Sequence, residues 1–267
     1  SVLIPVAYYV HHRKLGHSYR ESPNTREDRE ALRSWVLRSL IVRGIWGSGL
    51  DTLLRDLREV IKAQGSTSFP LAAVEKAMAL RGKSLAVTDA LIEDVLALEY
   101  GKARTFAVLA TLFPHVDTRN VFHVDHVFPA ARFDRKALAS LTADDGTPKF
   151  SAEHITELIE LRDTLPNLEL LPGLENIGKS DQAPDDWLAA EYPSQDDRSA
   201  FLARNALPST LPHSIDEFMA FYKQRRGSLV ARIQDKLKTQ GSEPSASEED
   251  LSEVALDEAL AEGDDEG

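Results

Sequence analysis

The 267-residue chain contains no cysteine at all. This absence excludes disulfides, zinc sites built on thiolates and cysteine nucleophiles. The chain also has no apolar run approaching about 18 residues and no recognisable signal peptide, so we expect a cytoplasmic protein without membrane spans. At this length there is room for one large domain or two ordinary ones, which must be held together by packing alone.

Basic residues are missing from one end of the chain. Residues 241–267 contain eleven Asp or Glu residues and no Lys or Arg. The rest of the chain has 31 basic and 32 acidic residues, so this end accounts for most of the net charge of −12. Such a composition is typical of a disordered, solvated tail. The spacing of Leu251, Val254, Ala255 and Ala259 also permits a short helix with one apolar face, which could dock onto a partner or onto a basic face of this chain.

The spacing of apolar residues predicts a mainly helical protein. An apolar helix opens the chain, and Thr25 with Asp28 and Ser48 with Asp51 are expected to begin helices that run to Trp46 and to Gly65. Further helices are predicted over residues 70–81, 88–99, 102–113, 151–162, 185–191, 195–205 and 214–239. Strand character is confined to residues 122–127 and to the segment that begins at Asn167.

The first strand carries the motif His-Val-Asp-His-Val-Phe-Pro at residues 123–129. Along a strand, His123 and Asp125 point to one face, while His126 points to the other or lies at the twisted strand end. A carboxylate and an imidazole that are adjacent in sequence can serve two purposes, since one can bind a metal and the other can bind water.

The second segment, Asn-Leu-Glu-Leu-Leu at residues 167–171, alternates like a strand and is followed by a Pro-Gly turn and a short helix that carries Asn176. Asp125 and Asn176 offer the oxygen ligands that suit Mg²⁺ or Mn²⁺. A structural alternative is a buried His126 and two Asn residues that form turns and helix caps. The chain has only five Asn residues, of which two fall on this motif.

Taken together, His126-Val-Phe-Pro129, the Asn-Leu-x-Leu-Leu segment and an Asn nine residues after Asn167 resemble the C-terminal HNH-like nuclease domain of GmrSD-type modification-dependent restriction enzymes. Within that family the chain resembles the SspE-like phage-defence proteins, which respond to phosphorothioate-modified DNA. Lys179 stands where HNH helices often place a Lys. Asp181 departs from the polar amide expected there, which leaves open whether it assists metal binding or caps the loop.

The resemblance implies an architecture and partners. Its fold would be mainly α with a small β-hairpin: an α-helical connector over residues 1–115, a helix-embedded ββα-metal nuclease unit over 116–240, and the tail over 241–267. A sensor and nucleotide-hydrolysing domain would precede Ser1. The activity would be endonucleolytic cleavage of foreign or phage DNA in restriction and antiviral defence.

The expected mechanism is metal-assisted hydrolysis of a phosphodiester bond. His126 would act as general base, Asn167 would orient its imidazole, and Asp125 and Asn176 would hold Mg²⁺ or Mn²⁺. His123 would be either a third ligand or a neighbour in the pleat. One such site cuts one strand, so the enzyme would be a nickase unless a second subunit of a homo-oligomer supplied another site. The predicted DNA contacts are Lys179, Arg132, Arg135 and Lys136, with the basic helix at 223–238 as a further candidate.

Two other classes of function stay open. An HNH-shaped module could bind DNA or a partner without cutting, which the near-neutral body of the chain favours because its electrostatic affinity for a polyanion is weak. A purely helical scaffold with a degenerate motif is the second, and in that case Asp125 and Asn176 would tolerate replacement by Ala.

Overall fold

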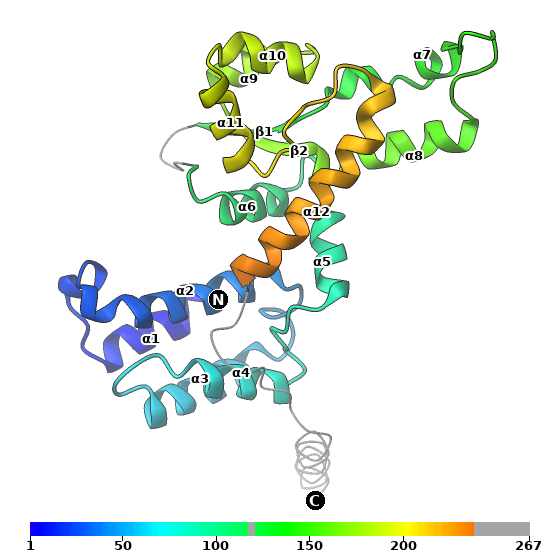
Figure 1. Cartoon of the computed structure of the whole chain (residues 1–267). Helices are drawn as coiled ribbons and strands as arrows, with labels where there is room; N and C mark the ends of the chain where they lie inside the picture. The colour runs from blue at the N-terminus through cyan, green and yellow to red at the C-terminus, as the bar shows by residue number, and fades with distance from the viewer. Residues whose placement is uncertain (117–120, 238–267) are drawn as a thin grey trace, which may run out of the picture. The chain divides into compact units, whose positions relative to one another are not determined.

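The computed structural model describes residues 1–116 and 121–237 (Figure 1). These residues form two compact units, one of residues 1–88 and one of residues 89–236. The structure is mainly helical and has one two-stranded antiparallel sheet, as the sequence predicts. No helix in the described ranges combines the length and apolar character needed to cross a membrane.

The first unit packs four helices around an aromatic and aliphatic core. Tyr9, Trp35, Leu57 and Met78 are fully buried, and the indole nitrogen of Trp35 donates to the sulfur of Met78 at 3.1 Å. The Tyr9 hydroxyl lies 2.8 and 2.9 Å from the two carboxylate oxygens of Asp28, which joins the first helix to the second. The helices are α1 (Leu3–His12), α2 (Arg26–Ile41), α3 (Leu50–Gln64) and α4 (Leu71–Leu80), with 3-10 turns η1 (His17–Arg20) and η2 (Pro23–Thr25) between the first two.

The ends of two helices differ from the prediction. Helix α2 ends at Ile41 rather than near Trp46, because Val42 is extended and Gly44 takes a positive φ of 79°. Helix α2 begins directly after Thr25, as predicted, but the Thr25 side chain does not cap it, and the N-cap of α3 is Gly49 rather than Ser48. The Thr25 hydroxyl donates to the Tyr19 and Ser22 carbonyls instead. Helix α3 begins after Gly49, whose φ of 69° is a conformation that glycine adopts without strain.

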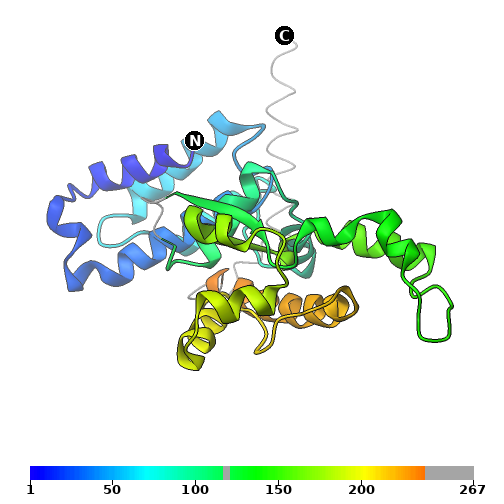
Figure 2. The same cartoon turned by 90° about the horizontal axis from the view of Figure 1, so that it is seen from above.

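The second unit surrounds the sheet with helices (Figures 1 and 2). Phe128, Phe133 and Phe218 contact one another at its core, and Trp187 packs edge-on against Phe201. Helices α7 and α8 pack together and extend away from the strands, as Figure 2 shows. The elements are α5 (Asp89–Leu96), α6 (Ala103–Leu112), β1 (Phe122–His126), η3 (Ala130–Phe133), α7 (Arg135–Ser140), α8 (Ala152–Arg162), η4 (Leu165–Asn167), β2 (Leu168–Pro172), α9 (Gly173–Lys179), α10 (Pro184–Glu191), α11 (Gln195–Arg204), η5 (Ile215–Glu217) and α12 (Phe218–Leu237).

The division between the units falls after Thr88 and not after residue 115. Helix α6 packs on both strands, and the Tyr100 amide, in the connection between α5 and α6, donates to the Asp163 carbonyl at 2.7 Å. These contacts attach residues 89–115 to the sheet, and apolar periodicity alone gives no sign of them. The short helix α7, which was not predicted, is capped by Asp134, whose carboxylate accepts from the Ala137 amide at 2.8 Å.

The two strands are paired so that Asp125 lies opposite Glu169 and His126 lies opposite Leu168. Directly opposed residues in an antiparallel pair share a face, so Asp125 and Glu169 lie on one face and His126 on the other. Helix α9 follows β2 without a gap and contacts both strands. The strand, strand and helix therefore form a compact unit that displays the motif residues.

A buried ion pair in the first unit gives a stability prediction. Arg38 and Glu75 form a salt bridge with side chains only 2% and 5% exposed. We expect Glu75→Ala to lower the free energy of unfolding by about 3–5 kcal/mol, because it leaves a buried guanidinium without its partner. The double replacement Arg38→Met with Glu75→Leu should recover most of that loss. Urea unfolding followed by fluorescence of Trp35 and Trp46, the two Trp residues of this unit, measures the effect.

The matched control is Glu59→Ala, which removes an exposed pair with Lys62 at 3.8 Å. That change should cost less than about 1 kcal/mol. If the Glu75 and Glu59 variants are equally stable, the buried pair does not stabilise the unit.

Candidate functional site

The imidazole of His126 is held at the end of β1 by a carboxylate. Its Nε2 lies 2.8 Å from Oδ1 of Asp163, and the Tyr100 ring stacks at a tilt against it with centroids 4.5 Å apart. The His126 side chain is about 10% exposed. Because an ionised carboxylate can only accept, Asp163 favours the tautomer with the proton on Nε2 and leaves the lone pair on Nδ1.

Asp163 is itself held by its neighbour Arg162. The guanidinium donates from Nε at 3.0 Å to both carboxylate oxygens and from Nη2 at 2.5 Å to Oδ2. Burial raises the pKa of Asp163, but hydrogen bonds from Arg162 and His126 outweigh it, so the pKa lies below its ordinary value. The carboxylate therefore stays ionised beside the imidazole at neutral pH.

The predicted contact between Asn167 and the His126 imidazole is replaced by a backbone role. The fully buried Asn167 amide accepts from the Phe128 amide at 2.9 Å and donates to the Phe128 and Arg162 carbonyls at 3.0 and 2.8 Å. All of its polar atoms are thus taken up by main chain. Asn167 joins the end of β1 to the end of α8, and this sets the distance between His126 and Asp163.

Lys179 lies inside the protein, which corrects its predicted contact with DNA. Its side chain is 1% exposed, and its ammonium donates to Oδ2 of Asp125 at 2.8 Å, Oε1 of Glu169 at 2.6 Å and the His126 carbonyl at 2.7 Å. Three such acceptors occupy the three donors of an ammonium group. Lys179 offsets one of the two negative charges that β1 and β2 present to α9.

The Glu169 carboxylate is also influenced by a second buried cation. Arg225 on α12 is fully buried and donates to the Leu168 carbonyl at 2.8 Å. Burial lowers the pKa of Arg225 to about 10, and the negative charge of Glu169 opposes that shift. Glu169 Oε2 and Arg225 Nε and Nη1 lack hydrogen-bond partners within the described part of the chain.

Asp125 and Asn176 retain atoms that could hold a cation. The Asp125 side chain is 22% exposed and uses Oδ2 for Lys179, while its Oδ1 has no partner among residues 1–116 and 121–237. Asn176 is half-buried on α9, and its amide likewise has no partner there. It lies three residues before Lys179 and hence beside it on the helix surface, which places it towards the Asp125 face.

His123 and Asp181 lie at the borders of this face. The His123 ring is exposed and lies over Gly173 at the start of α9. The two are so close that a Cβ atom placed on Gly173 would lie 3.5 Å from Nε2 of His123. Asp181 is exposed, and its carbonyl accepts from Arg132 at 3.0 Å. Ser180 before it has a φ of 46°, which turns the chain away directly after Lys179.

The three remaining predicted DNA contacts lie on the surface. Arg132, Arg135 and Lys136 are exposed on η3 and α7. Arg132 is engaged with the Asp181 carbonyl, and Arg135 donates to the Thr156 hydroxyl at 3.3 Å. Among residues 1–116 and 121–237 none of the three cations forms an ion pair with a carboxylate, so their charges remain available to an anion.

Sequence reasoning missed Asp163, Tyr100 and Glu169. A signal for Glu169 existed, because a charged residue within an otherwise apolar strand must find a buried partner. Asp163 gave no such signal, since Asp at the end of a helix is ordinary. Its role depends on the turn that Asn167 fixes.

A different acidic group lies elsewhere in the unit. Asp185, Asp186 and His213 have ligand atoms within 4.8 Å of one another, with His213 Nδ1 3.1 Å from Asp185. His213 is 61% exposed, and an exposed ion pair accounts for the contact without a metal.

No protein-family model matches the chain, and no curated protein matches it significantly in sequence.

The buried Asn167 amide generates a prediction that separates a backbone role from a catalytic one. Asn167→Ala leaves the buried amide and carbonyl of Phe128 and the part-buried carbonyl of Arg162 without these partners. A buried group left unpaired costs about 1–3 kcal/mol, so we expect the free energy of unfolding of the second unit to fall by about 2 kcal/mol or more. Chemical unfolding followed by fluorescence of Trp187 measures this. Asn24→Ala, at an exposed position, is the control and should change stability by less than about 0.5 kcal/mol. A stable Asn167→Ala variant would contradict the backbone role.

Proposed function

We propose that the second unit is a metal-dependent HNH-type DNA endonuclease in which His126 is the general base. The observation that carries the proposal is the His126 imidazole, which Asp163 fixes at 2.8 Å and which directly follows the partly exposed Asp125 along β1. Consecutive Cα atoms are about 3.8 Å apart, so a phosphate bound at the end of β1 can be reached by both side chains although they leave the strand on opposite faces.

The proton chemistry follows from the tautomer. With Nε2–H donated to Asp163, Nδ1 of His126 accepts a proton from the attacking water. The imidazolium that forms is stabilised by the Asp163 carboxylate, which Arg162 keeps ionised. Tyr100 covers one face of the ring and restricts its rotation. Asp163 and Tyr100 are thus positioning residues for the base.

The donors near Asp125 fit a hard divalent cation. Mg²⁺ and Mn²⁺ are commonly bound through one or two protein oxygens, with waters and substrate phosphate oxygens completing the coordination. Oδ1 of Asp125 and the side-chain oxygen of Asn176 supply two such atoms. When bound, the ion would stabilise negative charge on the phosphate and on the leaving oxygen. Lys179 holds the other Asp125 oxygen and so orients the carboxylate.

The biological role rests on the motif resemblance. In this proposed role, the unit nicks foreign or phage DNA as the C-terminal effector of a longer, modification-sensing protein. Arg132, Arg135 and Lys136 contact the DNA backbone. Exposed cations on adjoining segments η3 and α7 suit phosphate groups, which need charge rather than shape.

One observation favours a second candidate, a DNA- or partner-binding module that does not cleave. The Lys179 ammonium already neutralises Asp125 at 2.8 Å and would repel a metal ion brought to the same carboxylate. The metal experiment below distinguishes the two candidates.

The general-base assignment predicts the behaviour of two variants. His126→Ala should slow nicking of supercoiled plasmid by about 10²–10⁴ with an unchanged DNA affinity. Asp163→Asn should lower kcat by a smaller factor with little change in KM, because the base remains but loses its orientation and countercharge. His154→Ala, a histidine on α8 outside the site, is the control. Near-normal nicking by His126→Ala would contradict the assignment of His126 as the general base.

The metal assignment predicts weaker Mn²⁺ binding in Asp125→Ala and Asn176→Ala. Each should lose at least about tenfold in affinity by calorimetry, since even residues that only support metal ligands are typically worth that much. Cleavage should be abolished by EDTA and partly restored in the variants by excess Mn²⁺. Asp144→Ala, in the exposed loop after α7, is the control. Equal Mn²⁺ affinity in wild type and Asp125→Ala would favour the non-cleaving module.

A further inference from the structure

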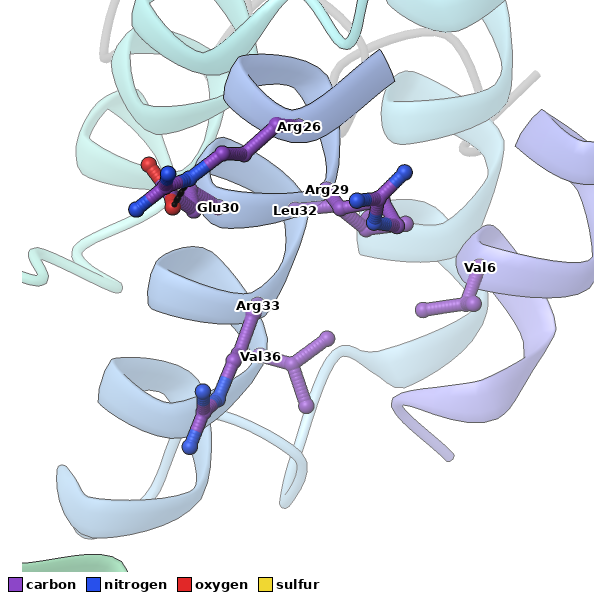
Figure 3. Close-up of a pocket in the computed structure, with 7 residues that line it drawn as sticks. All are labelled: Val6, Arg26, Arg29, Glu30, Leu32, Arg33 and Val36. Atoms are coloured by element: carbon purple, nitrogen blue, oxygen red, sulfur yellow. Dashed lines mark hydrogen bonds and ion pairs between the residues drawn. The ribbon is translucent and has the colours of Figure 1, made fainter. Parts of the chain in front are cut away.

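The first unit contains an open groove whose lining is apolar at its base and cationic around it. The groove, with a volume of about 550 Å³, is lined by Val6 on α1 and by residues of α2, namely Arg26, Arg29, Glu30, Leu32, Arg33 and Val36. Figure 3 shows Arg29 and Val36 pointing to the side on which α1 carries Val6, and the Arg26–Glu30 ion pair. We call this the α1–α2 groove.

The charge of the groove is not balanced locally. Three Arg and one Glu line it. Arg26 pairs with Glu30, whereas Arg29 donates to the Tyr19 and Ser22 carbonyls and the Thr25 hydroxyl, none of which is charged. Arg33 is exposed and has no partner in the described part of the first unit. An occupant should therefore be acidic.

The apolar surface continues beyond the groove along both helices. Leu3 is 73% exposed and lies three residues before Val6 on α1, while Leu40 is 53% exposed and lies four residues after Val36 on α2. Residues at these spacings lie on the same face of a helix. An occupant should therefore also present an apolar stripe, as an amphipathic helix does.

We propose that residues 241–267 of the same chain dock in the α1–α2 groove as an acidic amphipathic segment. Leu251, Val254, Ala255 and Ala259 fall on one helical face, and eleven carboxylates with no cation surround them. The four apolar side chains match the apolar lining of the groove, and the carboxylates match the Arg26, Arg29 and Arg33 side chains. This inference does not depend on the nuclease assignment.

The alternative surface for the acidic segment, the basic helix at 223–238, is less suited. Lys238 lies outside the described residues. Arg225 is fully buried and Arg226 pairs with Glu93. Among the described residues, none of the exposed large hydrophobic side chains lies on α12, so this helix lacks the apolar surface that the stripe of the segment needs.

The absence of cysteine allows a direct test with two introduced spin labels. Labels on Leu3→Cys, beside the groove, and Ser252→Cys should give a short and narrow distance distribution in the full chain by pulsed electron paramagnetic resonance. Arg26→Glu with Arg33→Glu should remove most of the short component, and so should 1 M salt, where the Debye length falls to about 3 Å from about 10 Å at 0.1 M. Adding Glu253→Lys with Asp257→Lys to the reversed groove should restore part of it.

A matched control reverses the same number of charges at the same spacing on a neighbouring helix. Arg55 and Lys62 on α3 are exposed and seven residues apart, as Arg26 and Arg33 are, so Arg55→Glu with Lys62→Glu should leave the distribution unchanged. Leu251→Asp with Val254→Asp removes the apolar stripe of the segment and leaves the groove unchanged, and it should also broaden the distribution.

Three outcomes would overturn the proposal. The first is a broad distribution in the wild-type background. The second is equal broadening by the α2 and α3 reversals. The third is loss of the short component on dilution with unlabelled protein, which would assign the groove to the segment of a second copy.

Discussion

The buried amide of Asn167 is the interaction on which the candidate site depends. It satisfies main-chain groups of Phe128 and Arg162, so it fastens the end of the first strand to the end of helix α8. A buried polar network is stabilising only when every member is satisfied, and here every polar atom of the amide has a partner. The distance from His126 to Asp163 is a consequence of that fastening.

The two faces of the sheet then acquire different chemistry from one alternating sequence. One face carries the carboxylates of Asp125 and Glu169, which both pair with Lys179, and the other carries the His126 imidazole, which is hydrogen-bonded to Asp163. The first arrangement combines a residue from each strand with one from helix α9, and the second combines a residue from β1 with one from the end of α8. The charged residues of the site are thus neutralised by the protein itself, which limits the cost of burying them.

The sequence predicted the elements of the site better than their connections. Period-two and helical spacing located the strands at 122 and 168 and the helix at Asn176, because these patterns report which side is buried. Spacing could not reveal that Asn167 bonds to backbone or that Lys179 points inward, since both outcomes depend on residues over 35 positions away. The domain boundary was misplaced for the same reason, because residues 89–115 are held by tertiary contacts with the sheet.

The buried ammonium of Lys179 has a consequence for how the protein matures. In zinc fingers the ion supplies the folding energy, so the empty protein is unfolded and chelators denature it. Here two internal cations, Lys179 and Arg225, already offset the charges of Asp125 and Glu169, and the surrounding core is built from aromatic and aliphatic side chains. The chain can therefore reach its native state during synthesis without waiting for a divalent ion. If the proposed metal site holds, the supply of metal would govern the activity of the protein rather than its abundance.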